Sequence, residues 1–416
     1  MKNLAPGYSL YIGLVLGLMP VTKYFAAVLL VFLCLIGGFR KFNLRAVWAG
    51  VPVAVYCIIH LALLYVHPGM LIFDWELVRV YLVVLVVTLP ICALLKSELI
   101  SWKLLEYGIF FGIWISVIIL GYDYIFLQIC RATGFSSNPL IPQFVLIPLS
   151  FFLLSQRFVT DRASWMDYSV LFAVVISSGL FSGGRMALYS VGILCSLLVL
   201  VLLYYRKSIQ SFLILLTLSI GIFVSILVDS STGCGFSKRI FSQFKTLEAL
   251  QTYSENRKID EVDGESVEQN LTLDAAPQIA AVDGAQLDIS SLQRWGMWGN
   301  AAAHIFSSAR SDQVILGAGR SVERAIVNRG LGTNYSHSHN QFFSWIISGG
   351  LLGFASGLFL LWSTILRGCL RVPGIFVFSG IILGSLTNSP MHVAEACAQM
   401  LILILFLRCW PDCGNA

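Results

Sequence analysis

The sequence predicts an all-α polytopic membrane protein with about twelve transmembrane helices and one large polar loop that carries short helices. Of its 416 residues, 57% are hydrophobic and only 12% are charged, and the mean hydropathy is +0.81. Soluble domains rarely reach such values, and the apolar runs repeatedly approach the roughly 20 residues that cross a bilayer as a helix. The first apolar stretch is followed at once by a second, which predicts a retained signal-anchor.

Positively charged residues set the expected topology. The predicted spans cover residues 7–22, 24–39, 46–66, 79–95, 104–122, 141–156, 166–182, 186–205, 209–229, 341–364, 372–388 and 391–408. With the N-terminus inside, the even-numbered connections hold most of the nearby Lys and Arg residues, whereas the short odd-numbered ones hold few, namely Lys23, Arg79, Arg131 and Arg185. Because cytoplasmic loops are enriched in Lys and Arg, both termini are expected in the cytoplasm.

The chain is expected to divide into residues 1–229 with nine spans, a large outer loop over 230–340, and residues 341–416 with three spans and a short tail. The middle of the loop, 246–290, is acidic and poor in aromatic residues, which predicts a solvated and mobile stretch. Residues 291–306 are instead aromatic and small, which predicts a helix at the membrane interface.

Ten cysteines do not indicate a disulfide scaffold, because most lie inside apolar spans, where a thiol behaves as a small hydrophobe. Only Cys130 and Cys234 fall in segments predicted to lie outside the cytoplasm. The sequence leaves open whether these two form a disulfide or stay free.

The most informative residue is His339, where the large loop meets the tenth span. Ser338 and Gln341 have capping-box spacing, which predicts a helix that begins at His339. At 100° per residue, three glycines below it would lie within about 40° of its direction and open a groove for a helix or a lipid chain: Gly350, Gly353 and Gly357. A place in the first turn favours a neutral imidazole, which suits a general base. The alternative is an interfacial histidine that hydrogen-bonds a loop.

Two neighbours of His339 are further candidates. His337 and His339 could form a metal half-site, but no cluster of Cys, Asp or further His completes it, so His337 is expected to be a loop residue near the site. The alternative is that His337, and not His339, is the base. Asn340 adjoins the same site. No P-loop and no outward-facing acidic metal motif is found. Neither a nucleotide nor a metal cofactor is therefore expected, and no nucleic-acid partner.

Arginines supply candidates for anion binding. Arg185 follows two glycines at the outer end of a span, where an arginine either faces a cavity or anionic partner or reaches to the interface. A guanidinium matches a phosphate in geometry and charge. Arg294 lies near Trp298 on the aromatic interfacial element, with a structural salt bridge as its alternative. Arg320 follows a glycine turn and is a weaker candidate, and Glu395 in the last span is expected to serve helix packing.

The order His339, Asn340, nine residues and then Gly350-Leu-Leu-Gly353 resembles the signature of bacterial O-antigen ligases and their relatives. The resemblance covers roughly residues 165–360. It includes the large loop before the signature helix and three further segments, namely 182–185, 294–298 and 316–319. Gly183 and Gly184 depart from the family, whose members often carry serine there.

Membership of this superfamily implies a GT-C-like architecture and glycosyl transfer on the periplasmic face of the bacterial inner membrane. The resemblance implies undecaprenyl diphosphate as carrier of the donor glycan and a terminal sugar of lipid A–core oligosaccharide as acceptor. His339 would be the general base, and Arg185 and Arg294 would bind the diphosphate. The transfer would invert the anomeric centre and need no metal, because diphosphate is a good leaving group.

Other functions stay open at this level. A polysaccharide polymerase uses the same donor, but such enzymes often have two comparable arginine-containing outer loops, whereas this chain has one dominant loop. A protein O-oligosaccharyltransferase usually carries a further C-terminal soluble region. A transporter or flippase of lipid-linked glycan is expected to show internal repeats or broken helices near the bilayer midplane, and no repeat is found. The ligase is therefore favoured.

Overall fold

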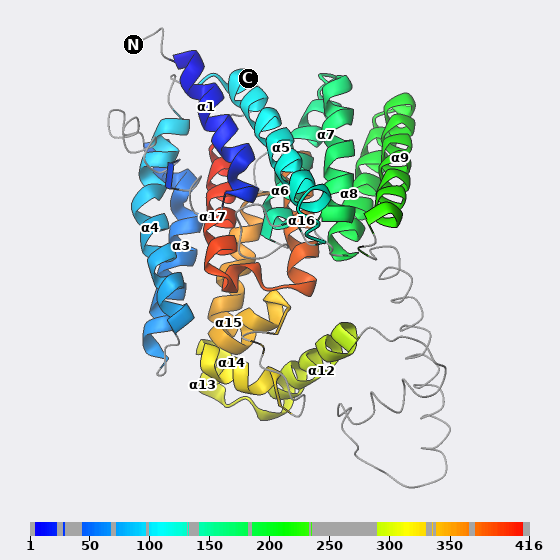
Figure 1. Ribbon diagram of the computed structural model, residues 1–416. Helices are drawn as coiled ribbons and strands as arrows, with labels where there is room; N and C mark the ends of the chain where they lie inside the picture. The colour runs from blue at the N-terminus through cyan, green and yellow to red at the C-terminus, as the bar shows by residue number, and fades with distance from the viewer. Residues whose placement is uncertain are drawn as a thin grey trace, which may run out of the picture.

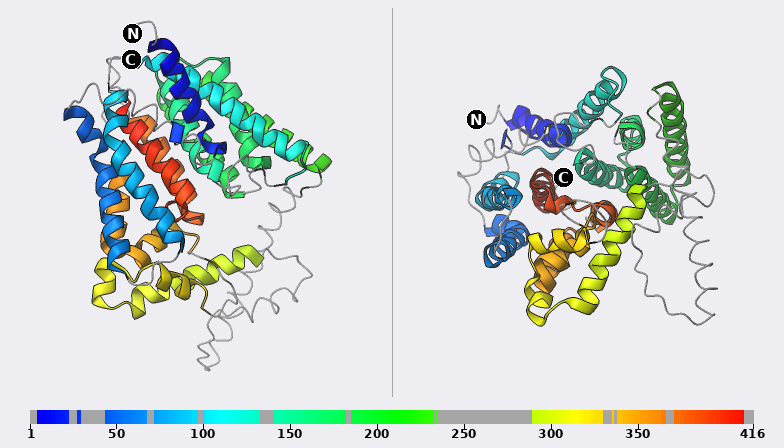
Figure 2. Two further views of the ribbon diagram at one scale, coloured as in Figure 1. Left: turned by 60° about the vertical axis from the view of Figure 1, so that its left-hand side comes forward. Right: turned by 60° about the horizontal axis from the view of Figure 1, so that its bottom comes forward.

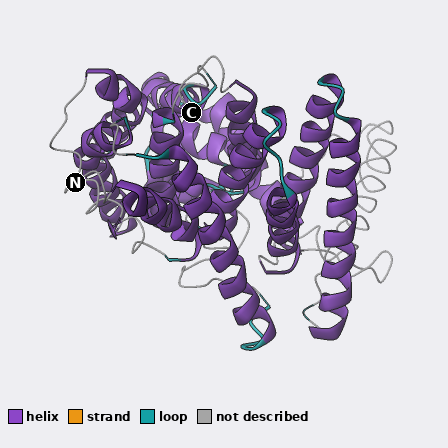
Figure 3. Ribbon diagram, turned by 90° about the horizontal axis from the view of Figure 1, so that it is seen from above, coloured by secondary structure: helices purple, strands orange, loops and turns teal. Residues whose placement is uncertain are grey.

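The computed structural model describes residues 5–22, 28–29, 44–67, 72–96, 100–130, 132, 141–181, 185–232, 234, 289–329, 335, 338–365 and 371–410. Regular structure among these residues is entirely helical, as Figure 3 shows. The predicted all-α class is therefore confirmed. The span expected over 24–39 lies outside the described residues except for 28–29, and the acidic stretch 246–290 lies outside except for 289–290.

The first half of the chain supplies α1 (Ala5–Leu18), η1 (Met19–Val21), α3 (Leu44–Val66), α4 (Ile72–Leu95), α5 (Trp102–Ile125), α6 (Ile141–Val159), α7 (Trp165–Ile176), η2 (Ser177–Phe181), α8 (Arg185–Tyr204) and α9 (Ser208–Thr232). After the stretch that is not described come α12 (Ile289–Ala303), η4 (His304–Ser308), α13 (Ser311–Leu316), α14 (Arg320–Val327), α15 (Gln341–Trp362), α16 (Arg371–Thr387), η6 (Pro390–His392) and α17 (Ala394–Cys409).

Six of the described helices are long and apolar enough to cross a membrane, and they occupy Val47–Val66, Asp74–Leu95, Trp102–Ile125, Met186–Tyr204, Ser208–Thr232 and Gln341–Trp362. Four shorter apolar helices cover Gly7–Val21, Gln143–Val159, Trp165–Leu180 and Val372–Leu386. The chain is thus a helical membrane protein. A total of twelve spans stays a prediction.

Close contact between α1 and α5 follows from paired glycines. Gly13 and Gly17 of α1 face Gly108 and Gly112 of α5, where a Cβ on any of the four would collide with the opposite backbone. Ser116 Oγ also donates to Gly17 O across 2.8 Å. Small residues at such spacing let two membrane helices pack backbone against backbone.

The short helices α12, α13 and α14 lie across one end of the bundle, whereas the first turn of α1 and the last turn of α17 point toward the other end (Figures 1 and 2). The interior is centred on α17, whose side chains are almost all buried. Glu395 is buried in its first turn.

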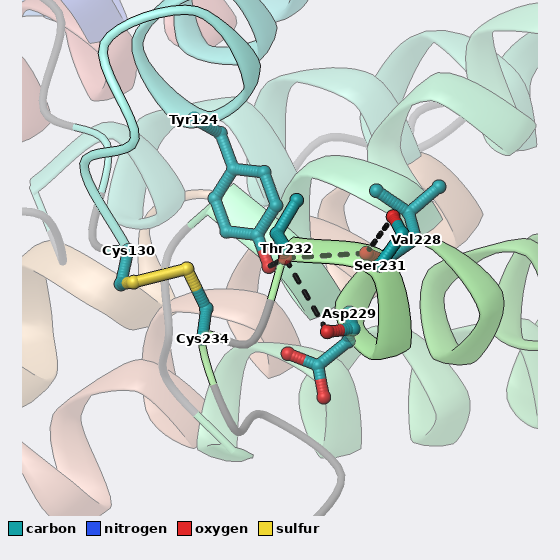
Figure 4. The surroundings of a disulfide bond; sticks show 7 residues. All are labelled: Tyr124, Cys130, Val228, Asp229, Ser231, Thr232 and Cys234. Atoms are coloured by element: carbon teal, nitrogen blue, oxygen red, sulfur yellow. Dashed lines mark hydrogen bonds between the residues drawn. A yellow bond between two sulfur atoms is a disulfide. The ribbon is translucent and has the colours of Figure 1, made fainter.

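Cys130 and Cys234 form a disulfide (Figure 4). The sequence left open whether these two cysteines are bonded or free, and the structure shows them bonded. Cys130 follows α5 and Cys234 follows α9. Beside the bridge, Tyr124 Oη and Thr232 Oγ1 are hydrogen-bonded at 3.0 Å. The ends of α5 and α9 are thus joined both covalently and by a hydrogen bond.

Candidate functional site

His339 lies in the loop before α15 and not in its first turn, so the predicted helix start is wrong. Asn340 is the N-cap, and its Oδ1 accepts hydrogen bonds from Phe342 N and Phe343 N at 3.0 and 3.2 Å. His339 has φ of 52°, in the left-handed region. Asn is among the best N-cap residues because its side chain satisfies the free N–H groups of the first turn. The helix therefore begins at Gln341, and His339 is presented from a tight bend.

The glycines of the signature do not form the predicted groove below His339. Gly350 has φ of 62° and ψ of −159°, which breaks α15 and ends the helical register on which that prediction relied. The freed carbonyls of Ile347 and Ser348 accept hydrogen bonds from Ala318 N and Gly319 N at 2.6 and 3.3 Å. The break therefore serves to dock the loop 317–319 against α15.

At two more glycines, the space that a Cβ would fill borders on protein atoms and is not open to a ligand. A Cβ at Gly357 would lie 2.6–2.7 Å from the ring of Trp345. A Cβ at Gly353 would meet Trp345 O at 3.1 Å. Trp345 is buried and donates from Nε1 to Tyr56 Oη at 3.2 Å. The small residues of α15 thus allow its own tryptophan to pack inward.

The surroundings of His339 favour a neutral imidazole. The pKa of His339 is lowered to about 4, chiefly by burial and also by the charge of Arg294, while a side-chain hydrogen bond with Asn388 acts in the opposite direction. The ring of Tyr335 meets the imidazole edge to face, with centroids 5.0 Å apart. The neutral form therefore dominates at neutral pH, although burial and Arg294 replace the helix dipole as its cause.

The aromatic helix α12 is fixed directly to the loop that carries His339. Trp298 Nε1 donates to Ser338 O at 3.0 Å, and Tyr335 Oη donates to Gln293 Oε1 at 2.8 Å. Met297 and Trp298 pack with Val327 and Tyr335. Arg294 lies one turn from Trp298 on α12, which places its charge beside His339. The sequence placed Arg294, Trp298 and His339 at one site, and the structure brings these three together.

Asn340 and Arg320 are engaged by the protein itself. Besides capping α15, Asn340 donates from Nδ2 to Leu386 O at 3.0 Å. The Arg320 side chain is 9% exposed, and its Nη1 lies 2.6 Å from Asp74 Oδ1. Its Nη2 donates a hydrogen bond to His392 O at 3.1 Å. Because Arg320 forms a buried ion pair with α4, its contacts favour a structural role.

Side-chain positions of two predicted residues lie outside the described structure. Arg185 begins α8, but its side chain is not among those described, and neither is His337. The span predicted over 79–95 also needs correction, since α4 begins at Ile72 and so includes Asp74. The buried pairing of Asp74 with Arg320 allows a carboxylate inside this helix.

Sequence reasoning missed the buried acid of the site. Glu323 is completely buried on α14. Its Oε1 accepts from Ser338 N at 3.1 Å and from Ser344 Oγ at 2.5 Å. His392 Nε2 lies 3.5 Å from the other carboxyl oxygen. The sequence around Glu323 resembles that of the solvated acids in the same loop. The one signal for its burial is its position on the apolar side of a short amphipathic helix.

Behind this group lies a cavity of about 30 Å³ at the junction of α3, α4, α14 and α15. Its polar lining comes from His60, His67, Asp74, Tyr81, Arg320, Ser321, Ser348 and His392. A space of this size accommodates ordered water and no sugar or diphosphate.

These features define a helical membrane protein in which a histidine and an arginine lie together where a layer of short helices meets one end of the bundle. Residues 169–358 match the family described as O-antigen ligase. The match runs from α7 through most of α15 and includes Arg294, Glu323 and His339, whereas Asp74, Asn388 and His392 lie outside it. The family resemblance seen in the sequence is thereby confirmed, and the function is broadly of the O-antigen ligase and polymerase type. Comparison with curated proteins gave no match.

Proposed function

We propose that the protein is an O-antigen ligase of the bacterial inner membrane, with both termini in the cytoplasm and His339 facing the periplasm. It transfers a glycan from undecaprenyl diphosphate to a terminal sugar of lipid A–core oligosaccharide. The observation that carries this proposal is a neutral, half-buried histidine beside an arginine, inside a match to the O-antigen ligase family. The layer of α12–α14 supplies an end surface where two lipid-linked substrates meet.

His339 is the general base in this reaction. Its neutral imidazole takes the proton of the acceptor hydroxyl while that oxygen bonds to the anomeric carbon. The bond from the anomeric carbon to the diphosphate breaks, and its electron pair leaves with the diphosphate. Attack from the face opposite to the leaving group inverts the anomeric centre. The negative charge that grows on the leaving group favours the imidazolium that forms beside it.

Arg294 and Arg185 are the proposed ligands of the diphosphate. Guanidinium groups form paired, charge-assisted hydrogen bonds to phosphate oxygens, and their effect is largest where water is excluded. Arg294 stands on a helix fixed to the His339 loop, so diphosphate binding and proton removal occur on neighbouring groups. His337, Asn340 and Trp298 complete the proposed substrate surface, with Asn340 and Trp298 acting through the loop they hold.

Deletion of the gene in its native host tests the assignment. A ligase predicts loss of capped lipopolysaccharide on gels while polymerised lipid-linked glycan accumulates. Lipopolysaccharide capped with single repeats would indicate a polymerase, and lipid-linked glycan trapped on the cytoplasmic side would indicate a flippase. Complementation with His339→Ala at normal expression is expected to fail. His304→Ala, which changes another histidine of the same layer, is the matched control and is expected to restore capping.

A further inference from the structure

The loop around His339 is held by one buried carboxyl group. Ser338 N, immediately before His339, donates to Glu323 Oε1, which also accepts from Ser344 Oγ of α15. Ser338 Oγ in turn donates to Asn340 O at 2.8 Å and lies 2.9 Å from Ser344 Oγ. Ser338 and Asn340 flank His339, whose backbone is left-handed. Ser338 is hydrogen-bonded to Glu323 directly, and Asn340 is linked to Glu323 through Ser338.

The other oxygen of Glu323 faces an imidazole whose tautomer is fixed by its neighbours. Gln341 Oε1 accepts from Met391 N at 2.8 Å, so its amide nitrogen is the group that donates to His392 Nδ1 at 3.0 Å. A nitrogen that accepts carries no proton, so neutral His392 bears its hydrogen on Nε2. That N–H points toward Ser348 Oγ at 3.3 Å and Glu323 Oε2 at 3.5 Å.

We propose that Glu323 is the positioning residue of this site, and that it sets the orientation of the His339 imidazole by anchoring Ser338 and Ser344 against α14. The role rests on the proposed function of His339 as general base. Glu323 touches neither substrate and acts through the backbone of Ser338. A left-handed residue persists only where its surroundings over-determine it, and these hydrogen bonds, together with Trp298 on Ser338 O, do so here.

A test that does not depend on ligation is the reactivity of His339. In the full-length protein in lipid nanodiscs, diethyl pyrocarbonate acylates neutral, accessible imidazoles, and mass spectrometry of the His339 peptide gives the rate. Glu323→Ala removes the acceptor, so the loop loosens and the rate is expected to rise several-fold. Glu323→Gln keeps an oxygen for Ser338 N and Ser344 Oγ and is expected to stay close to wild type. Val322→Ala, at an exposed neighbour on α14, is the matched control.

Ligation kinetics of the same variants complete the test. Because displacement of a catalytic group by about 1 Å can cost roughly 100-fold in rate, Glu323→Ala is expected to lower kcat by about that factor while KM for the lipid-linked donor changes little. The acid limb of kcat/KM should also move upward, since a looser loop exposes His339. Recovery of kcat in Glu323→Gln supports positioning by the acceptor oxygen.

Distinct outcomes separate the two proposals. An unchanged acylation rate and an unchanged acid limb in Glu323→Ala would overturn the positioning role, whatever the level of activity. Full ligation by His339→Ala would instead contradict the role of His339 as general base. The acylation rates would then still report whether Glu323 anchors the loop. If Glu323→Ala yields too little folded protein, Ser344→Ala takes its place, because it removes one of the two donors to Glu323 Oε1. Ser344→Ala is also expected to raise the acylation rate of His339. An unchanged acylation rate in Ser344→Ala would count against the proposal.

Discussion

At the scale of single residues, the protonation of His339 depends on Arg294. Burial and the arginine charge hold the pKa of His339 at about 4, below its ordinary value. Replacement by Gln removes one of these two effects, so the pKa rises. The neutral base is then lost at a higher pH, and the acid limb of kcat/KM for ligation is expected to shift upward in Arg294→Gln.

The same substitution removes a proposed diphosphate ligand. Loss of one donor to developing charge typically costs about 10²–10³ in rate, so kcat/KM in Arg294→Gln is expected to fall by that order across the pH range. Arg294→Lys keeps the charge but not the paired geometry and should recover the acid limb while recovering the rate only in part. An acid limb that stays in place in Arg294→Gln would contradict the electrostatic link between the two residues.

Residue types at the site were readable from the sequence, but their backbone was not. His339, Arg294 and Trp298 were identified because an imidazole, a guanidinium and an aromatic helix at one end of a bundle suit the chemistry. The helix start was misplaced because Ser338 and Asn340 both have the chemistry of an N-cap. Only the folded chain decides between them, by engaging Ser338 with Glu323 and leaving Asn340 to cap α15.

At the scale of elements, the break in α15 is a structural joint. A Cβ at Gly350 would collide with the backbone of Ile315, and its φ of 62° disfavours any other residue. Gly350→Ala is therefore expected to lower stability by about 1–3 kcal/mol, the usual cost of a strained backbone position. Thermal unfolding in detergent should show a lower Tm. Gly192→Ala in α8, where a Cβ meets nothing within 4 Å, should leave Tm unchanged or slightly higher.

An equal Tm for Gly350→Ala and wild type would mean that α15 can run straight through this position. Helix existence could be predicted because bilayer-length apolar runs leave few other structures for the backbone. The break could not, since Gly350-Leu-Leu-Gly353 has the composition of a continuous helix. Its cause is a contact with residues 317–319, which local periodicity does not record.

At the scale of the whole molecule, side chains from distant segments meet between α14 and the helices packed against it. Asp74 of α4 pairs with Arg320 of α14, Arg320 contacts His392 of η6, and His392 faces Glu323. These contacts join α4, the α12–α14 layer and η6 near the end of the chain. These long-range contacts could not be predicted from the sequence, because each of these charged residues has several plausible partners along the chain.

The disulfide joins the ends of α5 and α9 on the side that the predicted topology places outside the cytoplasm (Figure 4). Structural disulfides form and persist in the oxidising periplasm and are rare in the cytosol. The bridge spans a sequence separation of 104 residues, and closing a loop of roughly 100 residues stabilises a fold by about 4–5 kcal/mol in the chain-entropy description. Cys130→Ser with Cys234→Ser is therefore expected to lower Tm clearly.

Thiol counting tests both the bridge and the topology. Denatured protein from native membranes is labelled with a maleimide–polyethylene glycol before and after reduction, and two extra labels are expected after reduction. The Cys130→Ser, Cys234→Ser double variant should gain none, whereas Cys57→Ser, at a buried free thiol of α3, should still gain two. Equal labelling of the wild-type protein before and after reduction would contradict the disulfide. Loss of the two-label gain in cells that lack periplasmic thiol oxidation would place the ends of α5 and α9 on the periplasmic side, because cytosolic thiols are reduced whether or not that pathway is present.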